Sequence, residues 1–249
     1  MKRLRFAILA ISLLVVISSL QSCLDDDDND RYSLAIATVK VIDGQSYYFA
    51  LDDNTKMLPG DTTQIYNYPL KDGQRAFVYF NLLDEGVQGY DYNAKIRYIE
   101  NILTKGIIPL TEATADSIGD DHISPTNMWI GGGYLNIEFR LRGTDNPTRP
   151  HMLNLVQNAT TDPANEEEGY INLEFRHNAY DDSTTAGLKS GIVSFNLSQI
   201  ANLMTSEKGL KIRVNTLYDG IKYYKIDFKA ISAAMKFQQE KPKTTILIN

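Results

Sequence analysis

The sequence predicts an all-β protein: an N-terminal OB-like barrel followed by a C-terminal β-sandwich with one short helix. Its aromatic side chains are mostly tyrosine and phenylalanine, 15 and 9 against one tryptophan, and these residues favour the half-buried surface of a sheet. From residue 32 onward, runs of alternating apolar and polar residues are separated by turn-forming residues. A polar stretch near the middle of the chain divides these runs into two groups, which predicts two units.

The first 22 residues are predicted to be a signal peptide. Lys2, Arg3 and Arg5 give this segment a positive start, and an apolar run of 15 residues from Phe6 to Leu20 follows. A membrane-spanning helix needs roughly 20 predominantly apolar residues. The run is short of that length and is typical of the apolar region of a signal peptide.

The sequence Leu20-Gln21-Ser22-Cys23 resembles the lipobox of bacterial lipoproteins. That resemblance implies that cleavage occurs before Cys23 and that Cys23 carries the lipid. Two or more acyl chains would then hold the protein stably on a membrane. The alternative is an ordinary signal peptide followed by an incidental cysteine.

Residues 23–31 are predicted to be a lipidated acidic tether. Five aspartates lie between residues 25 and 30, and like charges that repel one another favour a solvated spacer. The segment also resembles the acidic clusters that follow the lipidated cysteine in surface-exported lipoproteins of the Bacteroidota. The resemblance implies an outer-membrane lipoprotein that is exposed at the cell surface.

Residues 32–110 are predicted to form the OB-like barrel. The strand candidates are 34–42, 46–51, 74–83 and the first half of 89–103, with turn residues between them. About five strands within so short a segment suit a small closed barrel, and the OB fold is the smallest common solution.

Residues 111–127 are polar without a sustained period, so we expect an inter-domain segment there, at the start of a C-terminal unit that spans 111–249. In this unit, Gly133–Arg140 recurs 36 residues later as Gly169–Arg176, and both copies alternate strictly. Each therefore predicts a strand with one wet face. Further strands are predicted at 151–157, 191–197, 210–217, 221–228 and 244–248, with a short helix at 198–204. This number of strands fits a β-sandwich.

With these segments in view, the whole chain resembles the NigD-like lipoproteins of the Bacteroidota. The residues that carry the resemblance are Met128–Arg140, the later echo at 172–178 and the stretch from Ile108 to Asp121. The resemblance implies an N-terminal OB-like domain and a C-terminal β-sandwich. The family name comes from a gene cluster linked to a bacteriocin, and the resemblance implies no catalytic residues.

Charge and composition exclude several classes of function. Without the signal peptide, 22 basic and 31 acidic side chains remain, a formal charge of −9. Such a chain has no long-range attraction for a phosphate backbone, so we expect no nucleic-acid partner. A single cysteine excludes an internal disulfide and a cysteine-based zinc site. His122, His151 and His177 are widely spaced, and we predict neither a metal site nor a cofactor.

Two patterns raise the question of catalysis. Gly131-Gly132-Gly133 suggests a phosphate loop, but such a loop needs a helix behind its glycines, and a strand is predicted there. Glu138 and Glu174 occupy equivalent places on two strands, as a glycosidase pair would if both lay in one cleft. Arg140 and Arg176 lie two residues further on, so charge pairing on an exposed sheet explains both carboxylates. We therefore predict no enzyme and no catalytic residue.

The tyrosines are the best candidates for binding. Tyr66 and Tyr68 are spaced two apart, as are Tyr90 and Tyr92, so each pair shares a face of an extended segment. Aromatic faces on OB barrels stack on sugars or bases. The alternative is that these rings fill or cover the barrel.

These observations favour a non-enzymatic surface lipoprotein that binds a protein or glycan partner or forms part of an envelope assembly. The resemblance leaves a second hypothesis, a bacteriocin-associated immunity or accessory lipoprotein. A glycan-acting hydrolase is the third.

Overall fold

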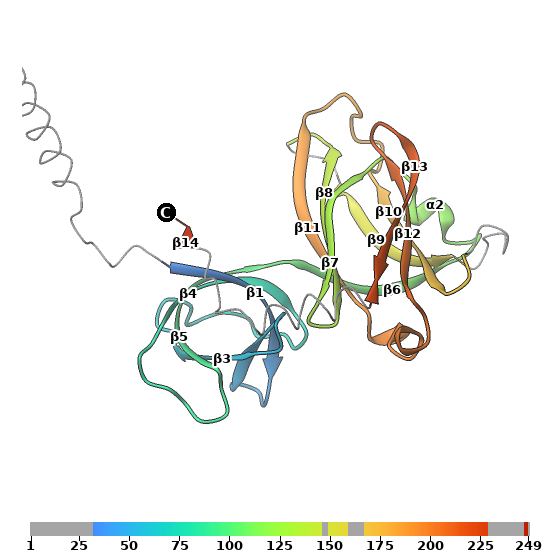
Figure 1. The fold of residues 1–249 in the computed structure, drawn as a ribbon. Helices are drawn as coiled ribbons and strands as arrows, with labels where there is room; N and C mark the ends of the chain where they lie inside the picture. The colour runs from blue at the N-terminus through green and yellow to red at the C-terminus, as the bar shows by residue number, and fades with distance from the viewer. Residues whose placement is uncertain (1–31, 146–148, 159–166, 229–246, 249) are drawn as a thin grey trace, which may run out of the picture.

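The computed structural model describes residues 32–145, 149–158, 167–228 and 247–248 (Figure 1). The predicted signal peptide and the whole predicted tether, residues 23–31 with Cys23, lie outside these ranges. The described residues form two sheets and very little helix. The prediction of an all-β protein is therefore confirmed.

The N-terminal sheet closes into a barrel of five strands. The strands are β1 (Tyr32–Val41), β2 (Tyr47–Leu51), β3 (Lys56–Asp61), β4 (Arg75–Leu82) and β5 (Tyr92–Asn101). Their order is β1-β2-β3-β5-β4, and β4 pairs back onto β1 from Ser33 opposite Phe80 to Thr38 opposite Arg75. β3 and β5 run parallel, and the other barrel pairs are antiparallel. Closure pairs the backbone of every strand on both sides, which removes the exposed edges of an open sheet.

Alternation along these strands builds the barrel core. Inward-facing side chains from every strand are buried: Ala37, Val39, Phe49, Met57, Ala76, Val78, Phe80, Ala94, Ile96 and Ile99. β1 and β4 were predicted from their content of apolar, β-branched and aromatic residues.

The C-terminal sheet has eight strands in the order β13-β12-β10-β9-β6-β11-β8-β7. They are β6 (Leu103–Leu110), β7 (Ser124–Gly131), β8 (Tyr134–Arg142), β9 (Met152–Asn158), β10 (Tyr170–Asn178), β11 (Leu188–Asn196), β12 (Gly209–Thr216) and β13 (Gly220–Asp227). The sheet folds into two facing layers (Figure 1), and one core is built from strands of both layers, including Leu135 and Phe195 from one and Leu155 and Phe175 from the other. This is the predicted sandwich.

β6 is the strand that joins the two layers. Its first half pairs with β11, Val193 opposite Leu103, and its second half pairs with β9, Ile107 opposite Leu155. The sequence placed this strand in the barrel unit, with the boundary near residue 110. The boundary between the two sheets lies instead between β5 and β6, because β6 finds its backbone partners in the sandwich.

Residues 111–127 belong to the sandwich rather than to a linker between the units. They contain α2 (Ala115–Ile118) and the beginning of β7. Ile118 packs with Leu110 and Val156, and Ile123 is fully buried in the main core. Polar residues that suggested a linker make contacts within the sandwich instead. Asp120, for example, forms ion pairs with two arginines of the sheet.

Two smaller expectations also need correction. The helix predicted at 198–204 is a pair of 3-10 turns, η2 (Ser198–Ile200) and η3 (Leu203–Thr205). The last strand, predicted for the sandwich, is β14 (Leu247–Ile248), and it pairs with Tyr32 and Ser33 of β1 at the barrel. The local sequence pattern cannot assign a strand to a sheet when its pairing partner lies this far away in the chain.

The two units meet around Arg75, whose side chain is fully buried. Its two terminal nitrogens donate to the carboxylate oxygens of Asp52 at 2.6 and 2.9 Å. They also reach the Thr38 hydroxyl at 3.1 Å and Oδ1 of Asn136, on β8 of the sandwich, at 3.2 Å. The Tyr134 ring lies 5.1 Å from the guanidinium, so the barrel and the β7–β8 hairpin share one charged, hydrogen-bonded contact.

The glycine run completes this contact. Gly131 pairs with Tyr134, and Gly132 and Gly133 between them have φ of 57° and 84°, which is the two-residue hairpin turn that needs positive φ at both positions. A Cβ on Gly132 would lie 2.9 Å from Oδ1 of Asp52. The run therefore makes a tight turn that the barrel approaches closely, and β8 rather than a helix follows it.

Candidate binding cleft

A cleft of about 760 Å³ lies in the C-terminal unit, where the ends of β9 and β10 approach η2 and η3. Its walls come from five strands, β6, β9, β10, β12 and β13, and from the two 3-10 turns. The polar lining residues are Gln157, Asn158, Asn172, Glu174, Gln199, Glu207, Lys211 and Arg213. The apolar and aromatic ones are Ile107, Ile108, Pro109, Tyr170, Ile171, Leu173, Ile200, Leu203 and Tyr223.

Glu174 is the most buried charged residue of the cleft, 6% exposed. Its carboxylate accepts hydrogen bonds from Nδ2 of Asn158 at 2.7 Å and from Arg176, and Arg213 lies at 3.5 Å. Three donors around one carboxylate hold it in a fixed position as a hydrogen-bond acceptor.

Asp120 links the two arginines beside Glu174. It binds Arg213 through both oxygens, at 2.9 and 2.8 Å, and Arg176 at 3.1 Å. Burial lowers the Arg213 pKa, but the hydrogen bonds and the charge of Asp120, together with the charge of Glu174, outweigh burial and raise that pKa overall. Two carboxylates and two guanidiniums thus form one network that fixes the polar wall of the cleft.

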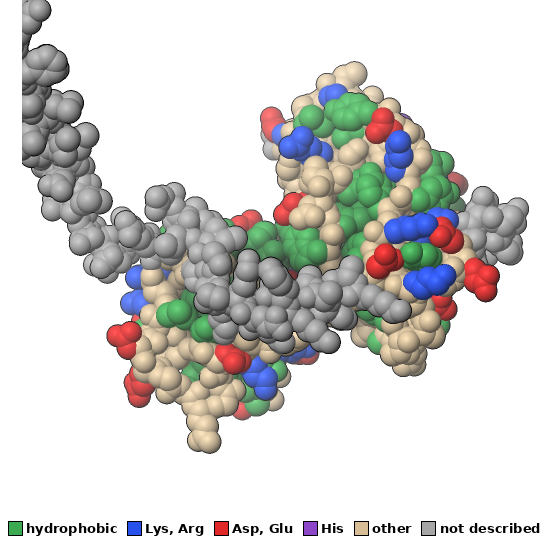
Figure 2. Space-filling view, in the orientation of Figure 1, with side chains coloured by type: hydrophobic (Ala, Val, Ile, Leu, Met, Phe, Trp, Pro, Cys, Tyr) green, Lys and Arg blue, Asp and Glu red, His purple; other side chains and the backbone are tan. Residues whose placement is uncertain are grey.

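Two tyrosines flank the cleft, and the ammonium group of a lysine lies over the ring of each. The Lys225 ammonium lies 5.0 Å from the centre of the Tyr170 ring, and Lys211 lies 4.8 Å from that of Tyr223. Glu167 binds both lysines, Lys225 at 2.6 Å and Lys211 at 3.4 Å. The hydrogen bond from Lys225 lowers the Glu167 pKa. Figure 2 shows the resulting mixture of Lys, Arg and acidic side chains on the right-hand side of the C-terminal unit.

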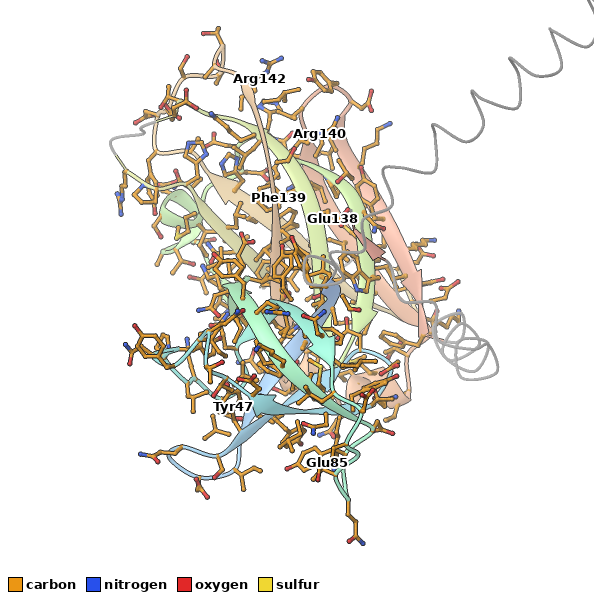
Figure 3. The ribbon with its side chains drawn as sticks, turned by 90° about the vertical axis from the view of Figure 1, so that its left-hand side faces the viewer. Tyr47, Glu85, Glu138, Phe139, Arg140 and Arg142 are labelled. Carbon is orange, nitrogen blue, oxygen red and sulfur yellow. The ribbon has the colours of Figure 1, made fainter. Side chains whose placement is uncertain are left out.

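The structure does not bring Glu138 and Glu174 into one site. Glu138 lies on β8, where it and Arg140 are exposed and Phe139 between them is buried (Figure 3). Its strand neighbours are Ile192 and Asn127, in the layer opposite β10, and it does not line the cleft. The ion pair predicted beside Glu174 is confirmed, because Arg176 binds it.

The four candidate tyrosines are divided between core and surface. Tyr68 and Tyr92 pack against the barrel core, and burial raises the pKa of Tyr68 to about 12. Tyr66 is 80% exposed, and Tyr90 is half-buried with its ring 6.1 Å from that of Tyr48. None of the four lines the cleft.

One pattern in the sequence points to the cleft. Tyr170, Asn172 and Glu174 are the wet-face residues of the second copy of the repeated strand, and all three line the cleft. The partners from β6, β12 and η3 carry no such signal, because only the fold brings them to β10.

Two of the three histidines do meet, on the sandwich. Nε2 of His177 lies 3.0 Å from Nδ1 of His151, whose Nε2 lies 3.0 Å from Asp182. Among the described residues, no group of three or more His, Cys, Asp or Glu side chains is placed to hold a metal ion. The same part of the chain has no helix long and apolar enough to cross a membrane.

Comparison with known proteins shows the family. The model of the NigD-like N-terminal OB domain matches residues 36–102, and that of the NigD-like C-terminal beta sandwich domain matches residues 106–228. No curated protein matches the chain.

Solved structures agree with these matches. A toxin related protein from Parabacteroides distasonis is 36% identical over 84% of this chain and 100% of its own, with a TM-score of 0.66. A protein of unknown function from Bacteroides vulgatus is 30% identical over 79% of this chain and 90% of its own, also with a TM-score of 0.66. A NigD-like immunity protein from Bacteroides caccae shares the fold with a TM-score of 0.55. It is 18% identical over 80% of this chain and 94% of its own. The chain belongs to the NigD-like family.

Proposed function

We propose that this protein is a lipid-anchored envelope protein that binds a protein or glycan partner in the sandwich cleft and carries out no chemistry. The cleft is the observation that carries the proposal. Its volume of about 760 Å³ is within the range of about 300–1,000 Å³ that is usual for ligand sites. Its polar groups are held by a network of ion pairs, so the site is formed before a ligand arrives.

The first part of the sequence supports the anchor and the location. A signal peptide over 1–22, the lipobox at Cys23 and the acidic tether to residue 31 would place the folded units outside the outer membrane. A binding protein held there presents both units to the surroundings of the cell.

The carboxylates of the cleft support binding rather than catalysis. A general acid must be free to reach the proton-accepting atom of a substrate. Glu174 has Arg176 and Arg213 beside it. Held by these partners, Glu174 can accept hydrogen bonds from a ligand and orient it.

The experiment is a crosslinked pull-down of envelope partners with the intact lipoprotein. Tyr223 and Leu203 are 51% and 44% exposed in the cleft, so Y223A/L203A should keep the fold and lose the partner. Tyr66→Ala, on the exposed barrel surface, is the matched control and should retain it. Equal recovery with both variants would contradict the cleft assignment. Turnover of a glycan or peptide by wild type, abolished in Glu174→Gln, would contradict the non-enzymatic role.

A second candidate function rests on the relatives. The 36%-identical relative is described as toxin related, and the B. caccae protein as an immunity protein. This chain would then protect its cell from a toxin. A deletion strain that becomes sensitive to a bacteriocin of neighbouring strains, with rescue by the intact gene, supports that role; unchanged sensitivity to a panel of such toxins counts against it.

A further inference from the structure

We infer that the cleft takes an uncharged oligosaccharide. This inference rests on the proposed binding function and narrows its ligand class. It follows from three features of the cleft: its charge balance, its side-chain amides and its exposed ring.

The charged residues that line the cleft cancel one another. Glu174 and Glu207 are acidic, and Lys211 and Arg213 are basic. Arg213 already binds Asp120 and Glu174, and Lys211 already binds Glu167. An anionic ligand would have to compete with these carboxylates for the basic groups. A neutral ligand leaves the ion pairs intact and needs no counter-charge.

The polar groups that remain suit hydroxyl groups. Four side-chain amides, Gln157, Asn158, Asn172 and Gln199, line the same cleft. An amide both donates and accepts, and a sugar hydroxyl does the same, so amides and paired carboxylates can bind hydroxyls from either direction. Gln157 and Gln199 are exposed, whereas Asn158 and Asn172 are already hydrogen-bonded within the wall.

The ring of Tyr223 offers the apolar contact that sugar rings use. The residue is 51% exposed on β13, and the Lys211 ammonium lies 4.8 Å from the centre of its ring. Leu203, 44% exposed, and Pro109 supply apolar surface in the same cleft. Sugar rings present C–H groups on one face and hydroxyls at their edges, which matches a cleft that holds both a tyrosine ring and side-chain amides.

An extended peptide is the competing ligand, and a peptide that binds by strand addition needs a free sheet edge. β12 pairs with a strand on each side, whereas Ile107–Leu110 of β6 pairs with β9 alone in the described sheet. The test therefore includes peptides, and the charge balance, the amides and the exposed ring are the features that favour a sugar.

The test uses the full-length protein in detergent on an array of neutral glycans, anionic glycans and peptides. The neutral probes are β-glucan, mannan and chitin oligosaccharides; the anionic probes are polygalacturonate and heparin. We expect binding to a neutral probe that changes less than about twofold between 0.05 and 0.5 M salt, because screening acts only on charge. Tyr223→Ala should weaken this binding at least about tenfold, as for a hot-spot aromatic, and Tyr223→Phe should retain it.

The control is Tyr98→Ala, which removes a 58% exposed ring from the barrel and should leave binding unchanged. Selective binding of anionic probes, or binding of peptides that Tyr223→Ala abolishes, would overturn the oligosaccharide assignment and leave the proposed binding function standing. Neutral-glycan binding that is insensitive to Tyr223→Ala would overturn the inference as well. No binding to any probe, together with no partner in the envelope pull-down, would overturn both.

Discussion

Arg75 is the residue on which the contact between the two units depends most. A fully buried guanidinium is costly unless a counter-charge balances it and acceptors surround its terminal nitrogens. Asp52 supplies the charge from the barrel, and Asn136 supplies an acceptor from the sandwich. The Ser194 hydroxyl donates to the same Asn136 oxygen at 2.7 Å, which holds that side chain in place.

Asp52→Ala should therefore lower the free energy of unfolding by about 3 kcal/mol, because it leaves the buried arginine unpaired. Denaturant unfolding measures this loss. Asp53→Ala is the matched control, since Asp53 hydrogen-bonds locally, to the backbone N–H and the hydroxyl of Thr55. An Asp52→Ala variant no less stable than Asp53→Ala would show that Arg75 does not need its partner.

The two turn glycines allow backbone strain to be separated from crowding. Alanine at either position adopts positive φ, which costs roughly 1–2 kcal/mol. At Gly132 the new methyl also meets Asp52, whereas at Gly133 no atom lies within 4 Å. We expect Gly132→Ala to lower the melting temperature more than Gly133→Ala. Equal decreases in melting temperature would mean that Asp52 moves away from the new methyl group at no cost in stability.

His177 predicts a stability change in mild acid. The His122 carbonyl accepts from Nδ1 of His177, so Nε2 accepts from His151 and has no place for a second proton. Burial, and then the charge of His151, lower the His177 pKa below its ordinary value of 6.5. As the pH falls below 6.5, the unfolded chain takes up this proton before the folded one does, so stability is lost.

Denaturant unfolding at pH 7.5, 6.5 and 5.5 tests this linkage. Wild type should lose stability towards pH 5.5, and His177→Gln should lose less. Asp182 does not interfere in this range, because the backbone N–H of Thr144, with Ser183 and His151, lowers its pKa to about 2. His122→Gln, which replaces an exposed histidine, is the control and should follow wild type. A His177→Gln profile parallel to wild type would contradict the assignment.

At the scale of elements, the contacts of α2 determine whether proteases can reach the segment between the two sheets. Ile118 on α2 and Ile123 before β7 are buried, and the backbone N–H of Asp121 donates to the His177 carbonyl at 2.8 Å. A segment fixed in this way should resist proteases although its composition is polar.

Limited proteolysis followed by mass spectrometry checks this expectation. No early cut should fall between residues 111 and 127 in wild type. Ile118→Asp puts a charge into the small cluster with Leu110 and Val156 and should make the segment susceptible. Ser117→Asp, at an exposed neighbouring position, should not. Early cleavage of wild type inside this segment would restore the linker interpretation.

The strands were predictable where one face is buried and the other is wet. β8 and β10 alternate strictly in sequence, and the structure buries Leu135, Ile137 and Phe139 as the pattern requires. Tertiary contacts also bury three residues of the expected wet faces, Tyr134, Asn136 and Glu174. The sheet to which β6 belongs was not predictable, because its partners Val193 and Leu155 lie far along the chain. The contact of Arg75 with Asn136 and the assembly of the cleft depend on tertiary structure in the same way.

At the scale of the whole molecule, the protein is a barrel and a sandwich that share a polar contact, with the cleft in the sandwich. The lipid anchor and tether that we propose precede the barrel, so the sandwich is the unit further along the chain from the membrane. A cleft in that unit is well placed for recognition, whereas Tyr68 and Tyr92 serve the barrel core.

Site-specific photocrosslinking in living cells tests the central claim most directly. A photoreactive phenylalanine analogue would replace Leu203 in the cleft or Tyr66 on the barrel, both exposed positions that should tolerate the change. We predict a discrete crosslinked species of the lipoprotein from position 203 and none from position 66. A crosslinked species from position 66 with none from position 203 would contradict the claim that this protein binds its partner in the sandwich cleft.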